Sequence, residues 1–287
     1  MYFIVELMEK RTISAMVIKS FWRKVLVLSI MFATLSIVQA QEDSLLLRFE
    51  ALLNKDWQEY FSDPFTADWT KNWFLDGEQA SITHSAKGVD FWAGPNALDD
   101  ASHAVLWTKK SFTGDLLIEY EFTRLDKTLR FVNIIYIQAT GSGGETFDHD
   151  IIKWSDYRNV PTMSKYFLNM HTYHISYAAF GTQNNDPDED YVRARRYMPS
   201  YSQLRNTDLK TDYFQTGFFR TDVPHKITII KKDEELFFHI SNDEKQQLFY
   251  WKNNQLPPIL EGRIGLRHMY TRGSRYSQFR ISVPTAE

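Results

Sequence analysis

The fold of this chain is most constrained by a succession of short strand-like segments, which turn residues separate and no helical stretch interrupts. Nine segments are rich in β-branched and aromatic residues: 80–84, 104–109, 116–123, 131–139, 173–180, 225–231, 235–241, 263–269 and 277–283. Many antiparallel strands without intervening helices, over about 225 residues, predict an all-β fold and not an α/β fold. We therefore expect a sandwich or jelly roll of two antiparallel sheets.

The residues before these strands have a different pattern. Leucine and phenylalanine side chains recur at helix-like spacing within residues 42–61, and the pattern ends before Ser62-Asp63-Pro64. We expect a short N-terminal helical segment at 41–62 and a single β-sandwich domain at 63–287. No repeat of 20 to 50 residues is visible, and nothing marks a further domain.

The N-terminus has the pattern of a cleavable secretory signal peptide. Three basic residues precede an apolar run at 25–38, and a small residue, Ala40, closes the pattern. We expect residues 1–40 to be removed before Gln41, with translation starting at Met16 and the product periplasmic or secreted. A membrane anchor is the alternative, but an apolar run of about fourteen residues is short for a bilayer.

Composition limits the partners and the means of stabilisation. The chain has no cysteine, so no disulfide holds it together and a sizeable core must do so. Removal of residues 1–40 takes away five basic and two acidic residues, which leaves 28 against 34 and a formal charge of −6. This balance disfavours nucleic acid as a partner. Membrane association after signal cleavage is not expected either.

Chemically versatile side chains are concentrated between residues 147 and 201. Imidazole and guanidinium groups gather there among tyrosines and aspartates, and they belong to His149, His171, His174, Arg193, Arg195 and Arg196. Packing of a β-rich protein gives no reason for this concentration, whereas a site for an anionic, hydroxyl-rich ligand does. We expect the active or binding site here.

Several segments resemble the concanavalin A-like (laminin G-like) β-sandwich superfamily. They are Asp63-Pro64-Phe65 with Trp69 and Trp73, Ala104-Val105-Leu106-Trp107, Phe112-x-Gly114-Asp115-x-x-Ile118-Glu119-Tyr120, and Tyr276-x-x-Phe279-Arg280-Ile281. The resemblance covers roughly residues 63–284. It implies the sandwich fold that the strand pattern also predicts.

A narrower resemblance rests on two further motifs. Tyr173-His174-Ile175-Ser176-Tyr177, with Arg195 downstream, and Gly262-Arg263-Ile264-Gly265-Leu266-Arg267-His268-Met269 are similar to the YesU-like family from bacterial polysaccharide-utilisation clusters. The family implies a carbohydrate-related role outside the cytoplasm and does not assign a reaction.

Calcium is the one metal that the resemblance brings in, because related sandwiches often carry a structural calcium ion. Oxygen ligands suitable for it are offered by Asn184, Asn185, Asp186, Asp188, Glu189 and Asp190. A solvated acidic loop is the alternative interpretation of these residues. His149 with Asp148 and Asp150 has only weakly specific metal spacing. No cofactor is required by the chemistry that we consider.

Elimination at a uronic acid is the reaction that the residues fit best. The sugar carboxylate must be neutralised, a base must remove the C5 proton, and an acid must assist the oxygen that leaves C4. Strand alternation places His171 and Tyr173 on one face of the strand and His174 on the other, so only one set can face the groove. The candidate catalytic residues are His149, His171, Tyr173, His174 and Arg195.

Other side chains are candidates for binding the sugar. Arg196 or Arg195 could clamp a carboxylate in bidentate fashion. On the last motif we favour Arg267 over His268, which has the same parity as Ile264 and Leu266. Aromatic candidates for stacking on sugar rings are Trp92, Trp154, Tyr197 and Tyr270.

Three function classes follow from these observations. The first is an exported carbon–oxygen lyase, either a polysaccharide lyase or an oligosaccharide dehydratase, that acts on an anionic glycan and leaves a 4,5-unsaturated uronate. The second is a non-catalytic glycan-binding module. The third is a glycoside hydrolase with a carboxylate pair about 5.5 Å apart, for which Asp148 or Asp150 with Glu119 or Glu121 are the candidates.

Overall fold

The computed structural model describes residues 39–201 and 204–285, which belong to two units divided after Asn54. In the first unit the described residues form a helix over 39–53. The predicted signal peptide lies almost entirely in residues 1–38, outside the described residues. No helix within 39–201 and 204–285 combines the length and apolar character that a membrane span needs.

The N-terminal helix is shorter than we predicted, because it ends at residue 53 and not near 61. Strand β1 (Trp57–Asp63) follows and pairs antiparallel with β16 (Gly273–Pro284). Phe61 lies edge-on to Trp73 in the sandwich core. The apolar residues at 57 and 61 therefore belong to a strand whose partner, β16, is far along the chain. A local helical pattern cannot reveal this pairing.

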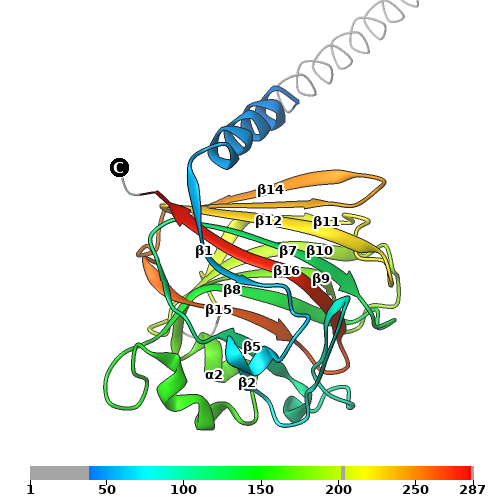
Figure 1. The fold of residues 1–287 in the computed structure, drawn as a ribbon, viewed down its shortest axis with the longest axis vertical. Coiled ribbons are helices and arrows are strands. Elements are labelled where there is room, and N and C mark those ends of the chain that lie inside the picture. Colours follow the sequence, from blue (N-terminus) through cyan, green and yellow to red (C-terminus); the bar gives the residue numbers. More distant parts are fainter. Residues whose placement is uncertain (1–38, 202–203, 286–287) are drawn as a thin grey trace, which may run out of the picture. The chain divides into compact units, whose positions relative to one another are not determined.

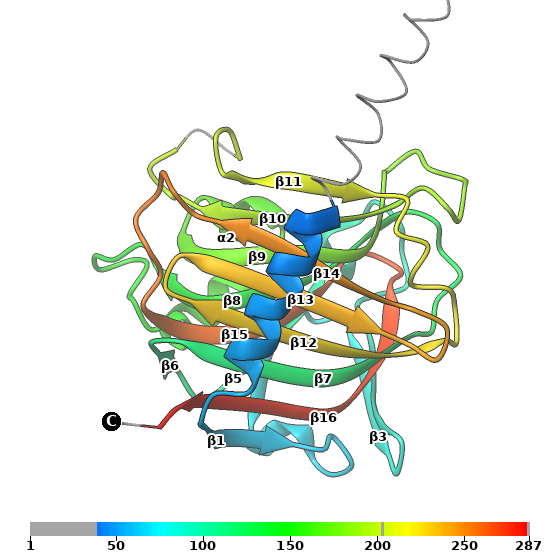
Figure 2. The ribbon, with the colours of Figure 1, turned by 90° about the horizontal axis from the view of Figure 1, so that it is seen from above.

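The second unit consists of two antiparallel sheets of eight strands each. The first sheet has the order β14-β13-β12-β7-β16-β4-β3, with β1 paired to β16, and Figure 2 shows β14, β13, β12, β7 and β16 in succession. Its remaining strands are β3 (Ser81–Ser85), β4 (Gly88–Trp92), β7 (Leu116–Arg124), β12 (Pro224–Lys232), β13 (Glu235–Ser241) and β14 (Gln246–Lys252).

The second sheet lies against the first and has the order β11-β10-β9-β8-β15-β5-β2, with β6 paired to β15 (Figure 1). Its strands are β2 (Trp73–Asp76), β5 (Ala104–Thr108), β6 (Phe112–Thr113), β8 (Phe131–Gly141), β9 (Met170–Phe180), β10 (Asp190–Tyr197), β11 (Asp208–Phe214) and β15 (Glu261–His268). Strand β14 thus lies at one end of the first sheet, and strand β11 lies at one end of the second.

The all-β sandwich prediction is confirmed, and each of the nine predicted segments contains a strand. Residues 190–197, which are not among the nine predicted segments, form β10 within the second sheet. Val192 and Ala194 on β10 face the core, whereas Arg193 and Arg195 point away from it. Because charged side chains occupy the outer face of β10, its sequence lacks the enrichment in β-branched and aromatic residues by which the other strands were recognised.

The main core lies between the inner faces of the sheets. Tyr177 on β9 faces Phe122 on β7 at a ring distance of 5.1 Å, and its hydroxyl lies 3.1 Å from that of Tyr276 on β16. His268 faces the same core and stacks on Phe91 at 4.4 Å, as its predicted parity requires. These contacts join strands from both sheets and hold the sandwich together.

A second apolar cluster covers part of the outer face of the second sheet. The 3₁₀ segment η3 (Ile151–Arg158) and helix α2 (Met163–Phe167) contribute Trp154 and Tyr166 to it. Tyr166 stacks on Tyr136 of β8 at a ring distance of 5.9 Å, with the rings nearly parallel. Residues 151–167 therefore close off the sheet face above β8, β15 and β5.

Candidate functional site

The predicted site residues separate into distinct places because successive side chains of β9 point to opposite faces of the sheet. Tyr173 and Tyr177 belong to the inner core, whereas His174 and Ser176 face outward. The structure thus places His171 and Tyr173 apart from His174. The cluster at 147–201 is close in sequence without forming one pocket.

His174 is enclosed on the outer face of the second sheet. Its Nδ1 lies 2.5 Å from the Tyr197 hydroxyl and its Nε2 lies 2.6 Å from the Ser176 hydroxyl. Burial, with Arg195 and Arg193 nearby, lowers the pKa of His174 well below its usual value. With 1% of its surface exposed and both nitrogens engaged, this imidazole has no direct access to a ligand.

The two arginines beside His174 are tied to aspartates of β11. Arg193 lies 2.7 Å from Asp212, and Arg195 lies 2.8 Å from Asp208. These ion pairs cross from β10 to β11 and are partly exposed. Arg195 is consequently engaged with a protein carboxylate, Asp208.

Arg267 lies under residues 151–167 and is fully buried. Its Nη2 donates to the Pro161 carbonyl at 2.6 Å and lies 2.6 Å from His103 Nδ1, while the guanidinium sits 4.4 Å above the Tyr166 ring. Tyr270, another predicted residue, packs edge-on to His103 at 4.2 Å. This region is closed by the covering segment.

His171, Arg196 and Tyr173 lie at one end of the sandwich. Arg196 Nη1 is 3.3 Å from His171 Nδ1, and Arg196 Nε donates to the Pro257 carbonyl at 3.0 Å. The Tyr173 hydroxyl accepts from Asn253 Nδ2 at 3.1 Å. Here the structure does bring imidazole, guanidinium and phenol groups together.

The protonation of this trio suits hydrogen bonding better than proton abstraction. Because Arg196 donates to Nδ1 of His171, the neutral ring carries its proton on Nε2. Burial, then the Arg196 charge, lowers the pKa of His171. Burial raises the pKa of Tyr173, so its phenol stays protonated. Neither side chain is a ready base in this arrangement.

The other predicted residues occupy separate positions. His149 is exposed and lines a pocket of 230 Å³ with Asp150 and Arg263. Trp154 is buried and donates from Nε1 to the Asp148 carbonyl at 3.0 Å. Trp92, 36% exposed, ends β4 in the first sheet. The structure does not bring these aromatic rings to a common sugar site.

The carboxylates considered for hydrolysis lie on opposite sides of the sandwich. On the outer face of the first sheet, Glu119 lies 3.4 Å from Arg280, and Glu121 accepts from the Ser277 hydroxyl at 2.8 Å. On the second sheet, Asp150 lies 2.8 Å from Arg263. The proposed pairing of these aspartates with these glutamates is therefore not formed.

The acidic segment at 184–190 is held by hydrogen bonds of its own. Both oxygens of Asp190 are occupied, since they accept from the Thr216 amide at 2.6 Å and the Thr216 hydroxyl at 2.5 Å. Asp186 caps the Asp188 amide at 2.9 Å. Among the described residues, no three metal-ligating side chains of the His, Cys, Asp or Glu type are grouped for an ion.

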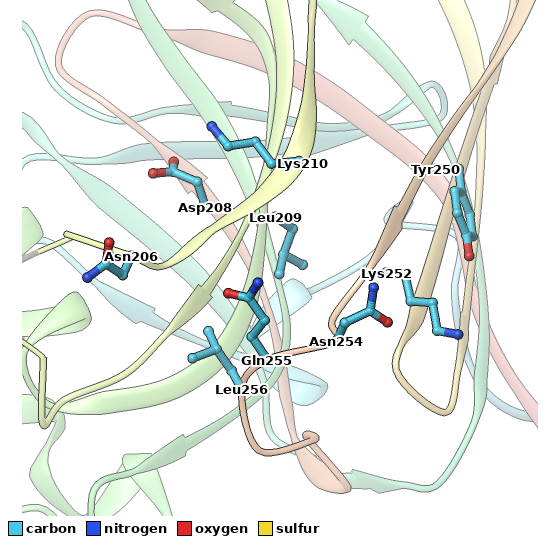
Figure 3. Close-up of a pocket in the computed structure, with 9 residues that line it drawn as sticks. All are labelled: Asn206, Asp208, Leu209, Lys210, Tyr250, Lys252, Asn254, Gln255 and Leu256. Carbon is cyan, nitrogen blue, oxygen red and sulfur yellow. The ribbon is translucent and has the colours of Figure 1, made fainter.

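A groove of 510 Å³ lies where β11 of the second sheet passes β14 of the first (Figure 3). It is lined mainly by amide, ammonium, carboxylate and phenol groups, and the residues are Asn206, Asp208, Leu209, Lys210, Tyr250, Lys252, Asn254, Gln255 and Leu256. In Figure 3 Lys210 belongs to the β11 wall and Lys252 to the β14 wall, and Asn254 and Gln255 come from the loop that follows β14.

The floor of the groove is connected to two of the predicted residues. Asp208 in the groove is the ion-pair partner of Arg195. Asn253 Nδ2 donates to the Leu256 carbonyl at 3.0 Å, and its Oδ1 accepts from the Leu256 amide at 3.1 Å. The same Asn253 side chain reaches Tyr173, so the trio at the sandwich end lies directly behind the groove loop.

Sequence analysis predicted none of the residues that line the groove. The run Lys252-Asn253-Asn254-Gln255 was a usable signal, because four consecutive polar side chains follow the aromatic pair Tyr250-Trp251. The opposite wall, Asn206 to Lys210, carries no comparable signal. This wall becomes part of a groove only because the end strands of two different sheets, β11 and β14, lie next to each other.

Buried neutral histidines should make the protein unstable in acid. Burial lowers the pKa of His225 to about 4, of His268 to about 3 and of His103 to about 2, from the usual value of 6.5. Below pH 6.5 these histidines bind more protons in the unfolded chain than in the folded protein. The free energy of unfolding then falls as pH decreases, by up to about 1.4 kcal/mol per pH unit for each ring.

We therefore expect stability to be highest above about pH 6.5 and to fall steeply toward pH 4. Urea unfolding across this range measures the slope. His268→Gln should reduce the slope by about one proton, whereas His84→Gln, at an exposed ring, should leave it unchanged. An unchanged slope in His268→Gln would contradict the assignment.

Comparison with known proteins supports the fold. The sequence matches no protein-family model and no curated protein. A protein of unknown function with a galectin-like fold from Bacillus subtilis is similar at a TM-score of 0.56 and 16% identity, over 80% of this chain and 100% of that one. The likeness shows a galectin-like β-sandwich fold, in agreement with the predicted fold class, and it does not show the YesU-like family.

A second group of similar structures is the exoplasmic/lumenal domain of VIP36. Its form with Ca²⁺ and Man3GlcNAc bound has a TM-score of 0.53 and 12% identity, over 81% of this chain and 92% of that one. Its metal-free form has a TM-score of 0.50 at the same identity, with 95% of that chain covered. At such identities only the fold is shared.

Proposed function

We propose that this protein binds a carbohydrate in the groove between β11 and β14. The observation that carries the proposal is the lining, in which three amides, two ammonium groups, one carboxylate and one phenol surround 510 Å³. Sugar hydroxyls both donate and accept hydrogen bonds, and amides offer both functions in one plane. The similar VIP36 domain, whose structure holds a mannose-containing glycan, supports carbohydrate recognition on this fold.

The preferred ligand carries negative charge. The groove lining has two positive charges, on Lys210 and Lys252, and one negative charge, on Asp208. The Asp208 carboxylate is already paired with Arg195. The chain from residue 41 onward has a formal charge of −6, so a local cationic excess stands out against an acidic background. Such a site attracts a uronate or a sulfated sugar and not a neutral one.

Calorimetric titration of the purified protein with acidic and neutral glycans tests this function. We expect Lys252→Ala to weaken binding of an acidic glycan roughly tenfold or more, because a hydrogen bond to a charged group contributes about 1.5–3 kcal/mol. Lys87→Ala, at an exposed lysine of the β3–β4 turn, is the matched control and should bind normally. Equal affinities in Lys252→Ala and Lys87→Ala would refute the groove.

β-Elimination at a uronate is a second candidate function, and one observation favours it. Arg196 is 3% exposed, and among the described residues no carboxylate lies within ion-pair distance of it. A substrate carboxylate would supply the missing charge and draw Arg196 away from His171 Nδ1, which would then accept the C5 proton, while the Tyr173 hydroxyl donates its proton to the oxygen that leaves C4. Ultraviolet absorbance of a 4,5-unsaturated uronate in the same glycan panel, lost in His171→Ala, would establish this reaction.

The setting of this activity is also part of the proposal. The predicted signal peptide places the protein in the periplasm or outside the cell, and the YesU-like motifs fit polysaccharide utilisation. N-terminal sequencing of the exported product should find Gln41 as the first residue. A product that retains residues 25–38 would contradict export by cleavage.

A further inference from the structure

A second pocket, of 320 Å³, lies near the opposite ends of the same two strands. Like the groove, it is lined by cationic, amide and aromatic side chains, and the residues are Gly217, Phe218, Phe219, Arg220, Val223, His225, Asn242, Glu244 and Lys245. We refer to it as the Lys245 pocket. Neither the proposed groove nor the predicted trio accounts for it.

The two pockets share one rim of the sandwich. Residues 242–245 immediately precede β14, whereas Tyr250 and Lys252 end it in the groove. On the other wall, β11 leaves the groove at Lys210 and is followed by Gly217. A strand of this length extends roughly 20 Å. The pockets therefore lie at the two ends of one edge.

Direct contacts hold β11 and β14 together between the pockets. The Tyr213 hydroxyl donates to the Tyr250 carbonyl at 3.1 Å and accepts from the Tyr250 amide at 3.2 Å. Trp251 Nε1 donates to the Thr211 carbonyl at 2.7 Å. The rim is thus a continuous surface, to which β11 also adds the exposed Phe214 at its end.

The Lys245 pocket is a formed site with its main cation held in place. Lys245 Nζ donates to the Thr216 carbonyl at 2.9 Å and lies 4.2 Å from the Phe218 ring centre. A Cβ atom on Gly217 would come within 2.8 Å of this nitrogen, so the glycine leaves room for it. Among the described residues, Lys245 has no carboxylate within ion-pair distance. Its charge remains available to an anion.

Charge makes the two pockets alike. Among the residues that line the Lys245 pocket, Arg220 and Lys245 exceed Glu244 by one formal positive charge, and Arg220 also lies 3.9 Å from Asp188 at the surface. In the groove Lys210 and Lys252 face Asp208, which is the same excess. Two cationic pockets at the ends of one edge, on an acidic chain, match a ligand that carries repeated negative charges along its length.

We propose that the ligand is an acidic oligosaccharide long enough to occupy both pockets, with one chain lying along the β11–β14 edge. This inference rests on the proposed carbohydrate binding in the groove and adds the length and direction of the ligand. Contacts at both ends add an intramolecular binding step, so affinity increases with chain length until both pockets are filled. Beyond that length the gain ends.

The test uses a panel of polygalacturonate, alginate and heparin, and then graded fragments of whichever binds the full-length protein. We expect Lys245→Ala to leave the affinity for short fragments unchanged and to weaken binding of long fragments on the order of tenfold. Lys252→Ala should weaken binding at every length, and Lys87→Ala at none. Thermal unfolding of each variant verifies that the fold is retained.

The outcomes separate this inference from the proposed function. If Lys252→Ala weakens binding while Lys245→Ala has no effect at any length, the groove stands and the extended ligand is refuted. Binding of two long fragments per protein would also refute a single track, because each pocket would then hold its own chain. If no glycan in the panel binds, or if Lys252→Ala binds normally, the proposed function fails and the inference with it.

Discussion

Replacing Asp126 by alanine is expected to destabilise the protein by about 3–5 kcal/mol, because it leaves two buried cations without a counter-charge. Asp126 Oδ1 accepts from Arg124 Nε at 3.2 Å, and Oδ2 accepts from Arg272 Nε at 3.0 Å. Both guanidinium groups are buried. A loss of this size is a large part of the total stability of a typical domain, about 5–15 kcal/mol.

Urea unfolding of the variant measures the loss. Asp90→Ala is the matched control, because Asp90 forms a two-nitrogen pair with Arg275 at 2.6 and 2.8 Å at a partly exposed position. Water replaces much of that interaction, so we expect a loss of about 1 kcal/mol or less. Similar losses for Asp126→Ala and Asp90→Ala would show that burial does not decide the effect.

Trp107→Ala is expected to have the second largest effect, about 3–5 kcal/mol, through the cavity it leaves in the covered outer face of the second sheet. The Trp107 ring stacks on Tyr136 at 5.3 Å, and its Nε1 donates to Asp76 at 2.7 Å. Its six-membered ring also lies against Gly265, where a Cβ atom would come within 2.4 Å. The loss should appear in both urea and thermal unfolding.

A double-mutant cycle checks the packing against Gly265. Gly265→Ala alone should cost about 1–3 kcal/mol, because the methyl group must displace a fully buried ring. In the Trp107→Ala background the added methyl group fills space, so the second cost should nearly vanish. Additive losses would contradict the contact between Gly265 and Trp107.

The buried arginines fall into two groups, those with a carboxylate partner and those without one. Arg124 and Arg272 share Asp126, and Arg158 lies 2.6 Å from Asp76. Arg196 and Arg267 are also buried, yet within the described residues they contact only carbonyl groups, histidines and rings. Sequence analysis selected both of these arginines as ligand-binding; the structure encloses Arg267 under residues 151–167, whereas Arg196 lies beside His171 at the end of the sandwich.

Much of the sheet structure could be predicted from local patterns. Segments such as 116–123 and 131–139 carry enough β-branched and aromatic residues to be recognised alone. The parity of His268 followed from its apolar neighbours on the same strand. Strands β10 and β11 were missed, because Arg193, Arg195 and their partners place charge on one face of each.

Site prediction succeeded less well, because neighbouring side chains on a strand point to opposite faces of the sheet. His171 and His174 are three residues apart, yet one lies beside Arg196 and the other beside Tyr197 on the opposite face. Closeness in sequence indicated one pocket where the sheet forms separate environments. The groove walls at 206–210 and 250–256 lie about 40 residues apart and meet only where the two sheets end.

The sequence by itself determined the all-β class and the strands whose apolar alternation is strong. These properties depend on side-chain alternation along a strand and on composition, which need no knowledge of distant partners. The tertiary structure alone decided which faces are closed, which arginines lack a counter-charge and where the groove and the Lys245 pocket lie. Those features arise from pairings between residues far apart in the chain, and local patterns do not encode them.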